Sequence, residues 1–394
     1  MLYDVDFINN ILTSKSNAMV KLAARQGVLN LDSGVTLCKC PFHKSDFEEL
    51  FIDTENNTWA CPVCGKYGNA ISFIMLLKDY SFDNAVKYLA KRAHIEVPEI
   101  TETENYNDSP NDVFYKVNAA AAGYFYESLL SGKSLEAQKY FRKRKLTLDS
   151  IVKFRLGCAP GFGQNLYNYL KEKGFKDDVL IMSGLIGISA DGKPYDKFRN
   201  RVMFPIADKD NRIIGFGGRV LDDSKPKYLN SPATPVFDKK QNLYGFNLAK
   251  KTKEDFFIFC EGYMDVIAMH QAGFDNAVAS LGTALTAEQV RLISEYTDKV
   301  VLAYDSDGPG INAAIRALDL FKAESIDCKV INMKDCKDPD EFIKKHGKKA
   351  FRDCILNAES GQHYKFRQLK KIKDSMEFYD LAVNALIEED DNIG

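Results

Sequence analysis

The sequence predicts a multidomain protein of mixed α+β and α/β class. Its expected parts are a small N-terminal domain built around cysteine pairs, a basic mixed α/β segment, an α/β unit with a parallel sheet, and a short helical C-terminal segment. Three observations support this prediction: a length of 394 residues, a regular alternation of strand-like and helical patterns after residue 255, and a strongly uneven charge. The hydrophobic fraction of 45% and the charged fraction of 27% are ordinary for a globular protein.

The charge changes sign twice along the chain, although the net charge is only −2. Residues 1–138 hold 12 Lys/Arg against 18 Asp/Glu, residues 139–251 hold 23 against 11, and residues 252–394 hold 18 against 26. A basic middle segment followed by an acidic one is typical of a protein that binds a polyanion beside a metal site. The alternative is a solvated surface whose charge is merely uneven.

Nothing in the sequence predicts a membrane protein or an exported one. No run approaches the roughly 18 apolar residues that span a bilayer, and the N-terminus lacks the basic start and apolar core of a signal peptide. The nine cysteines are odd in number and too few for a disulfide scaffold of this length. We therefore expect a cytoplasmic chain with metal-bound and free thiols and no membrane partner.

The first elements follow from hydrophobic periodicity and turn residues. Residues 1–30 are expected to form a helix, and short strands and turns should follow over residues 35–58. A second helical stretch is expected over residues 69–94. Residues 98–112 are acidic and polar with two prolines, so they form the clearest linker. A helix over residues 113–130 follows the linker.

The later elements include the clearest signal of fold class. Short strands broken by glycines are expected between residues 153 and 251, among them residues 201–206 and 213–216. After residue 255 strands and helices alternate, which predicts a compact unit with a parallel sheet. The expected order is strand 256–260, helix 264–272, strand 277–280, helix 286–296, strand 300–304, helix 310–322 and strand 330–332. Helices should complete the chain over residues 341–394.

Two of these apolar strands end abruptly in carboxylates. One is followed by Glu261 and Asp265, the other by Asp305 and Asp307. Because ligands gather beyond the carboxyl ends of parallel strands, neighbouring strands would set Glu261, Asp305 and Asp307 in one crevice. Clustered carboxylates repel one another or take up protons, a conflict that a hard cation such as Mg²⁺ resolves. The alternative is that these acids merely cap the helices that follow.

Two ligand pairs with zinc spacing lie in the N-terminal segment. Cys40 and His43 form a C-x2-H pair, and Cys61 and Cys64 form a C-x2-C pair, with seventeen residues between the two pairs. Two such pairs on tight turns can close a tetrahedral site with three thiolates and one imidazole, which is typical of one structural Zn²⁺. Cys38 would point to the opposite face of a strand from Cys40, so it is left out of the ligand set.

In order and spacing, these motifs resemble those of the bacterial DnaG-type DNA primases. The zinc segment followed by Gly65, Asn69 and Phe73 is similar to the family's CHC2 zinc-binding domain. The stretches around Glu261 and Asp305 look like the Toprim module that primases share with topoisomerases. Further similar stretches are residues 199–206, 215–219, 226–232, 243–245, 279–284 and 337–341. The resemblance extends over residues 20–355.

The resemblance and the element pattern together imply five segments. They are a zinc-binding domain (1–97), a linker (98–112), a basic N-terminal subdomain of the RNA polymerase core (113–252), a Toprim catalytic subdomain (253–340) and a helical C-terminal segment (341–394).

The resemblance implies synthesis of short RNA primers on a single-stranded DNA template during DNA replication, by nucleotidyl transfer from ribonucleoside triphosphates. It also implies a catalytic Mg²⁺ or Mn²⁺ besides the structural zinc. The expected ligands of the catalytic metal are Glu261, Asp265, Asp305, Asp307, Asp338 and Asp340. Glu261, Asp305 and Asp307 would be the catalytic residues. For Asp338 and Asp340 a simple turn role is the alternative.

A set of cations would hold template phosphates and the incoming triphosphate. Its members are Arg144, Arg199, Arg201, Arg219, Lys227 and Lys239. Arg199 and Arg201 alternate along an expected strand, so they would lie on one face and clamp one phosphate together. Each cation could instead be an ordinary solvated surface charge.

The sequence departs from the family's pattern in three places. Where the family has a Lys-Thr-Pro-Ser-like segment after the histidine, this chain has the acidic residues 46–49, and Lys145 replaces a glycine after Arg144. The first departure bears on how the zinc module contacts nucleic acid. The chain also stops at Gly394, where relatives continue into a helicase-binding domain. The alternatives are a truncated chain, or a phage or mobile-element protein that recruits its replicative helicase differently.

Two other functions compete with this interpretation. A Toprim nuclease or topoisomerase-like enzyme would not need the zinc module or residues 199–232, and topoisomerase action would require a nucleophilic tyrosine near the acids. A non-catalytic single-stranded-DNA-binding protein of the replisome would not need intact acids at the three central positions.

Overall fold

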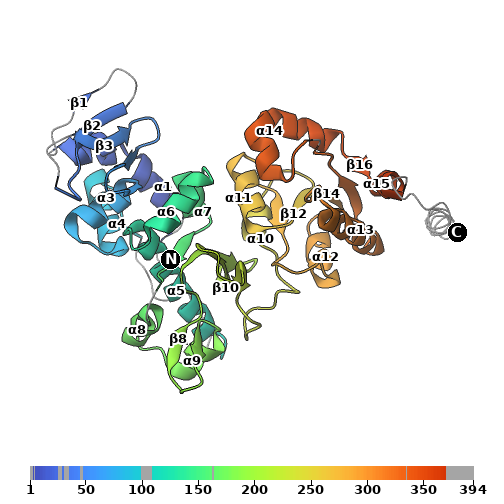
Figure 1. The fold of residues 1–394 in the computed structure, drawn as a ribbon, viewed down its shortest axis with the longest axis horizontal. Helices are drawn as coiled ribbons and strands as arrows, with labels where there is room; N and C mark the ends of the chain where they lie inside the picture. Colours follow the sequence, from blue (N-terminus) through green and yellow to red (C-terminus); the bar gives the residue numbers. More distant parts are fainter. Residues whose placement is uncertain are drawn as a thin grey trace. The chain divides into compact units, whose positions relative to one another are not determined.

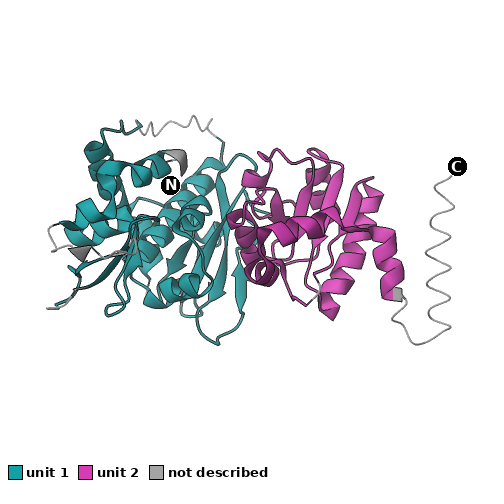
Figure 2. Cartoon of the chain, turned by 90° about the horizontal axis from the view of Figure 1, so that it is seen from above, with its two compact units in different colours: residues 1–238 teal, residues 239–394 magenta. Residues whose placement is uncertain are grey.

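The fold is described from a computed structural model (Figure 1), which describes residues 3, 5–24, 29–30, 35–44, 48–98, 109–161, 164–333 and 335–369. The chain divides into two compact units, Met1–Asp238 and Lys239–Gly394 (Figure 2). The expected boundaries of the five segments stay predictions, and most of the expected linker lies outside the described residues. Within the described ranges, no helix combines the length and apolar composition that a membrane span requires.

Unit 1 begins with short helices and a small antiparallel sheet whose five strands follow one another in sequence order. The elements are α1 (Val5–Thr13), a 3-10 turn (Lys15–Asn17), α2 (Met19–Ala23), β1 (Leu29–Asn30), β2 (Val35–Lys39), β3 (Glu48–Asp53), β4 (Thr58–Ala60), β5 (Tyr67–Gly68), α3 (Ala70–Lys78) and α4 (Phe82–Ala93).

One helix prediction in this region is wrong and one is confirmed, and in both stretches the chain is broken locally. The single helix expected over residues 1–30 is interrupted where Ser14 and Ala18 adopt extended backbone angles around the 3-10 turn. The helical stretch expected over residues 69–94 consists of α3 and α4. Asp79 closes α3 in the left-handed region, with φ 52°, and the side chain of Ser81 then caps α4 by accepting a bond from the backbone N–H of Asn84.

The rest of unit 1 is a mixed α/β fold around a second sheet. Its elements are α5 (Asp112–Leu130), α6 (Leu135–Lys143), α7 (Leu148–Lys153), β6 (Gly157–Ala159), α8 (Asn165–Glu172), α9 (Asp177–Met182), β7 (Ile186–Ile188), β8 (Pro194–Asp196), β9 (Arg201–Ala207), β10 (Ile213–Val220) and β11 (Tyr228–Asn230). The strand order is β11-β10-β9-β6, antiparallel throughout, and β7 pairs with β8. The helix predicted over residues 113–130 and the strands predicted at 201–206 and 213–216 are confirmed as α5, β9 and β10.

The core of this part lies between α5 and the four-stranded sheet. Phe125 of α5 packs its ring against Phe198 and Phe216, at centroid distances of 6.5 and 5.4 Å. Gly157 of β6 allows the close approach, because a Cβ there would lie 2.5 Å from the backbone carbon of Phe125. These contacts hold α5 against the sheet whose strands β9 and β10 carry two of the predicted cations, Arg201 and Arg219.

Unit 2 is the predicted α/β unit. Its elements are α10 (Phe246–Ala249), β12 (Phe257–Cys260), α11 (Tyr263–Gln271), β13 (Ala277–Ala279), α12 (Ala287–Ser294), β14 (Lys299–Ala303), α13 (Gly308–Ala323), β15 (Asp327–Val330), α14 (Pro339–Leu356), β16 (Glu359–Ser360) and α15 (Gly361–Leu369). The strand order is β13-β12-β14-β15-β16. The first four strands are parallel, as predicted, and β16 adds an antiparallel edge that was not expected. The strand expected at 330–332 ends earlier, at Val330.

The central strands of this sheet are apolar because both faces are covered. All four residues of β12 are buried, and the parallel register pairs Phe257 with Val300 and Phe259 with Leu302. These side chains join one hydrophobic cluster with buried residues of α12 and α13, so the alternate residues face the opposite side. Continuous apolar strands of this kind are what doubly covered parallel sheets require. Both strands therefore direct their carboxyl ends to the same edge of the sheet.

Candidate functional site

The ends of β12 and β14 bring two of the predicted acids together. Cys260 pairs with Ala303 in parallel register, so Glu261 and Asp305 follow the strands at one edge of the sheet. The backbone N–H of Asp305 donates to Oε1 of Glu261 at 2.9 Å. This bond ties the two strand ends to each other across the sheet edge.

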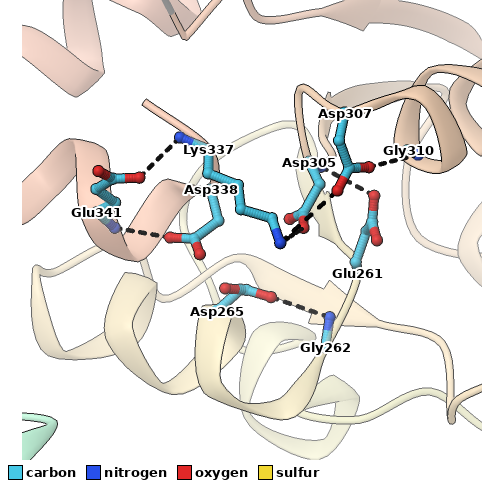
Figure 3. A network of polar contacts seen from close by, with 9 residues as sticks. All are labelled: Glu261, Gly262, Asp265, Asp305, Asp307, Gly310, Lys337, Asp338 and Glu341. Carbon is cyan, nitrogen blue, oxygen red and sulfur yellow. Dashed lines mark hydrogen bonds and ion pairs between the residues drawn. The ribbon is translucent and has the colours of Figure 1, made fainter. Parts of the chain in front are cut away.

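Three further acids sit at helix starts around this edge, each with one carboxylate oxygen bound to a backbone N–H (Figure 3). Asp307 accepts from Gly310 at 3.1 Å at the start of α13, and Asp338 accepts from Glu341 at 2.8 Å at the start of α14. Asp265, in the first turn of α11, accepts from Gly262 at 3.1 Å. The capping role considered as an alternative is therefore real for these acids, and it fixes the direction of each carboxylate.

We call Glu261, Asp265, Asp305, Asp307, Asp338 and Asp340 the carboxylate cluster. Its charges act on one another. Burial, with the charges of Asp338 and Asp305 as the next causes, raises the pKa of Asp265 to about 8. Burial and the charges of its neighbours also raise the pKa of Glu261 and of Asp305. The folded chain thus holds more negative charge at this edge than its own groups compensate.

Two lysines offset part of that charge. The ammonium of Lys337 lies 3.6 Å from Oδ2 of Asp305 and 3.7 Å from Oδ2 of Asp307 (Figure 3). Asp340 is 7% exposed, and its Oδ2 lies 2.5 Å from Nζ of Lys344 one helical turn later. The sequence analysis included Lys337 only within the stretch 337–341 and did not predict it as a site residue. Its position next to Asp338, in a segment rich in acids, is the signal that points to it.

The acids of the carboxylate cluster do not form a closed ligand set by themselves. Across the described ranges, no three members of the carboxylate cluster offer ligand atoms all within 4.8 Å of one another, whereas the cysteine and histidine cluster does. Carboxylate oxygens with raised pKa values are the donor set that a hard divalent cation stabilises, and Mg²⁺ keeps several waters and substrate oxygens in its shell. The residues therefore fit a divalent metal that is completed by substrate.

Two cavities flank the carboxylate cluster. One, of about 540 Å³, is lined by Asp305 and Lys337, and the other, of about 630 Å³, is lined by Glu261 and Arg316. Tyr304 lines both. Burial, with the charge of Glu261 as the next cause, raises the pKa of Tyr304 far above its ordinary value.

The zinc ligands come together in unit 1, as predicted. Cys40 directly follows β2 and Cys61 directly follows β4. Both strands run antiparallel to β3, so their ends lie at the same edge of the small sheet. The ligand atoms of Cys40, His43, Cys61 and Cys64 all lie within 4.8 Å of one another, and Nε2 of His43 is 3.2 Å from Sγ of Cys61.

The chemistry of this group fits a closed zinc site. Burial raises the pKa of Cys40, and the nearby thiols add to the effect. For Cys61 burial acts in the same direction, but hydrogen bonds from the Cys64 backbone and from His43 outweigh it and lower the pKa. A divalent zinc ion would remove this conflict by binding all three thiolates. Cys38 is fully buried outside the group, in agreement with its omission.

Two of the predicted cations meet on one aromatic ring in unit 1. The guanidinium of Arg219 lies 4.6 Å from the ring centre of Tyr140, and that of Arg144 lies 5.8 Å from it. Tyr140 was not predicted as a site residue. The signal is its spacing of four residues from Arg144 at the end of α6, which places the two on one helix face.

The expected clamp of Arg199 and Arg201 is wrong. Strand β9 begins only at Arg201, and Asn200 has a positive φ of 50°, so the two arginines do not alternate along one strand. Arg199 is exposed, with its guanidinium 5.4 Å from the ring centre of Tyr195. Arg201 is 6% exposed and donates to backbone carbonyls, so it does not present its guanidinium to a ligand.

The remaining two predicted cations lie in different units. Lys227 is exposed beside β11 in unit 1. Lys239 belongs to unit 2, where its carbonyl accepts a bond of 2.8 Å from Nε2 of Gln289, and its side chain is partly exposed.

Comparison with known proteins supports one family along most of the chain. Sequence models of three families match: the CHC2 zinc finger over residues 6–105, the DNA primase catalytic core, N-terminal domain over residues 124–250, and a Toprim-like family over residues 258–343. The DNA primase of Clostridium acetobutylicum is 42% identical over 362 residues, which are 90% of this chain and 60% of that protein.

Two solved structures extend the comparison. The zinc-binding and RNA polymerase domains of the Aquifex aeolicus primase superpose with a TM-score of 0.62 at 29% identity, covering 97% of this chain and 96% of that one. A DnaG primase catalytic domain bound to single-stranded DNA gives a TM-score of 0.60 at 36% identity and covers 66% of this chain and 83% of that one. The chain spans 52–62% of the length of the curated relatives that it matches. With its zinc segment, basic core and Toprim unit in the same order as in these proteins, the chain belongs to the family of bacterial DnaG-type DNA primases.

Proposed function

We propose that the chain acts as a DNA primase, a nucleotidyltransferase that makes short RNA primers on single-stranded DNA from ribonucleoside triphosphates. The observation that carries this proposal is the carboxylate cluster at the carboxyl edge of the parallel sheet, in a chain of the primase family. The chemistry needs a 3′-hydroxyl to attack an α-phosphate while pyrophosphate leaves, and most of the work is positioning and charge stabilisation.

We assign Glu261, Asp305 and Asp307 as the catalytic residues, with Asp265 and Asp338 beside them. Asp340 contributes charge at longer range, because its carboxylate is paired with Lys344 in the structure. Bound Mg²⁺ or Mn²⁺ would neutralise the triphosphate and stabilise the attacking and leaving oxygens.

The chain's own part is to hold these ligands still. The bond between the Asp305 backbone and Glu261 keeps two strand ends in register, and the helix-start bonds of Asp307 and Asp338 fix their carboxylates. Burial and the neighbouring acids raise the pKa of Asp265 to about 8, so a bound cation would favour loss of the proton from its carboxyl. Lys337 gives partial compensation to Asp305 and Asp307.

We further propose that Arg144, Arg199, Arg219 and Lys227 bind phosphates of the template or of the incoming nucleotide, and that Lys239 of unit 2 also binds phosphates. The relative solved with single-stranded DNA supports the choice of template. The zinc module would contribute to template recognition. A replicative helicase would be the partner that brings the enzyme to the template, and the reaction would take place in the cytoplasm.

The test is primer synthesis on single-stranded DNA with labelled ribonucleotides and Mg²⁺ or Mn²⁺. Short RNA should appear with the natural chain and fall by a factor of at least about 100 with Glu261→Gln, since a catalytic carboxylate is lost. Glu288→Gln makes the same chemical change on an exposed residue of α12 and should leave synthesis unchanged. DNA cleavage in place of synthesis would favour the nuclease alternative, and binding without synthesis would favour the non-catalytic one.

A further inference from the structure

Arg201 occupies an unusual place for an arginine in a family that binds polyanions. It begins β9, is 6% exposed, and directs Nη1 at the carbonyl oxygens of Gly218 and Pro226, both at 3.0 Å, with the Lys227 carbonyl at 3.5 Å. These carbonyls belong to the end of β10 and to the segment that leads into β11. One buried side chain thus spans both arms of the β10–β11 hairpin.

The sequence makes space for this side chain. A Cβ at Gly218 would lie 3.0 Å from Cδ of Arg201 and 2.9 Å from Cδ1 of Phe198. Gly218 has an ordinary extended backbone in β10, so its glycine is required by the close approach and not by a turn. The methylene groups of Arg201 therefore pass directly over position 218 of β10, where any residue larger than glycine would collide with them.

The three carbonyls belong to residues at or next to two of the side chains proposed to bind phosphate, Arg219 and Lys227. Gly218 directly precedes Arg219, and Pro226 directly precedes Lys227. The backbone N–H of Val220 donates to the Lys227 carbonyl at 3.0 Å, so the two arms are already joined by a ladder bond. Arg201 adds a second link beside that bond.

Arg201 and Arg219 lie on opposite faces of the sheet. Arg219 pairs with Val202 across the β9–β10 ladder, whereas Arg201 pairs with Val220. Directly paired residues share a face, and neighbours along a strand alternate. The ring of Tyr140 approaches the guanidinium of Arg219 on its own face. Arg219 is thus held by an aromatic ring, while its backbone is held by Arg201 from behind.

Stability alone does not account for an arginine at this position. Among the ion pairs of the described residues, none joins Arg201 to a carboxylate at contact distance; burial lowers the pKa of Arg201, and the more distant charge of Asp222 offsets only part of this effect. Burying a cation without a charged partner is costly, and a neutral residue could close a hairpin that already has its ladder bonds. What the guanidinium adds is a long side chain whose terminal Nη1 carries two N–H donors and reaches carbonyls of both arms at once.

We infer that Arg201 is a positioning residue that locks the β10–β11 hairpin so that Arg219 and Lys227 are held ready for a phosphate-bearing ligand. This inference rests on the proposed function, because it takes Arg219 and Lys227 to bind nucleic-acid or nucleotide phosphates. It also replaces the phosphate contact that the sequence suggested for Arg201 by an indirect role.

A double-mutant cycle on the full chain tests the inference. Fluorescence anisotropy would give the Kd for a labelled single-stranded oligodeoxynucleotide at several salt concentrations. The variants are Arg201→Met, the pair Arg219→Met with Lys227→Met, and all three together. Lys193→Met removes an exposed cation of unit 1 that is paired with Asp191, and serves as the control for loss of charge.

The double variant should weaken binding and lower the salt slope by about 1.4, because each phosphate contact to a single strand contributes about 0.7. Arg201→Met should weaken binding about fivefold in the natural background and less than about twofold in the double variant, since residues that act through one another are not additive. Equal losses in both backgrounds would overturn the inference, and so would a double variant that binds like the natural chain.

Arg201→Lys keeps the test decisive if the methionine variant unfolds, which thermal unfolding would reveal. Lysine retains the charge and would still bind a phosphate directly, but its side chain is shorter than that of arginine, so its ammonium does not reach the position that Nη1 takes between the carbonyls. Binding weakened at least about threefold supports the positioning role, and binding equal to the natural chain overturns it. These measurements need no polymerisation, so a chain that makes no primer would defeat the proposed function while leaving this outcome readable.

Discussion

Replacing Asp265 by asparagine should stabilise the metal-free protein at neutral and alkaline pH. The carboxyl of Asp265 is surrounded by other acids and has a pKa raised to about 8, with burial as the main cause. Asparagine keeps the shape of the side chain and an oxygen that can accept the bond from the Gly262 backbone. The substitution therefore removes mainly the ability of the side chain to ionise.

The sign and size follow from proton linkage. An ordinary aspartate has a pKa of about 3.9, so the folded state binds more protons than the unfolded state between about pH 4 and pH 8. The free energy of unfolding then falls as the pH rises through this window. Four pKa units at about 1.4 kcal/mol each set an upper bound of about 6 kcal/mol. Because neighbouring carboxylates share the repulsion, about 1–4 kcal/mol is the expected gain for Asp265→Asn at pH 8.

Differential scanning calorimetry of the zinc-loaded chain in buffer free of Mg²⁺ would measure the effect. The melting temperature of Asp265→Asn should exceed that of the natural chain at pH 8, and the difference should shrink towards pH 5. Adding Mg²⁺ should raise the melting temperature of the natural chain more than that of the variant. A difference that is equal at pH 5 and pH 8, or a variant less stable than the natural chain at pH 8, would refute the reasoning. Glu288→Gln, on an exposed acid, should show neither effect.

Three further predictions concern unit 1. Removal of zinc, or the substitution Cys61→Ser, should shift the fluorescence emission of Trp59 to longer wavelength. This residue is the sole tryptophan of the chain, and it is 2% exposed beside the turns that carry the zinc ligands. Unchanged emission would contradict the role of zinc in the fold. Tyr140→Ala should weaken binding of single-stranded DNA about fivefold in anisotropy measurements, since two cation–π contacts of about 0.5–1 kcal/mol each are lost, while Tyr140→Phe keeps the ring and should bind normally. Gly218→Ala should cost about 1–3 kcal/mol of unfolding free energy by crowding the strand, whereas Gly123→Ala, with open space at its Cβ, should be neutral or stabilising by thermal unfolding.

The parts of the molecule that the sequence predicts well are those in which short-range pattern and long-range packing agree. β12 and β14 are recognisable because doubly covered strands are continuously apolar, and the zinc ligands because each pair sits on one tight turn. The acids were placed at the sheet edge because parallel strands share a direction.

The parts that the sequence misses depend on distant partners. Arg201 looks like a surface cation, and only carbonyls 17 and 25 residues further along the chain make it a buried link. Tyr140 of helix α6 becomes a candidate site residue only through its contact with Arg219, which lies in strand β10 much later in the chain. The break between α3 and α4 turns on the left-handed conformation of a single residue, Asp79, which no hydrophobic period reveals.

The acids at the starts of α13 and α14 have a consequence for which substitutions the protein can tolerate. Asp307 and Asp338 each hold a helix start with one oxygen while contributing charge to the carboxylate cluster. Asparagine or serine would satisfy the helix but not the charge, and glutamate would supply charge while being a poor cap. Aspartate alone meets both requirements. Asparagine variants at these two positions would therefore separate chemistry from folding, which alanine variants cannot do.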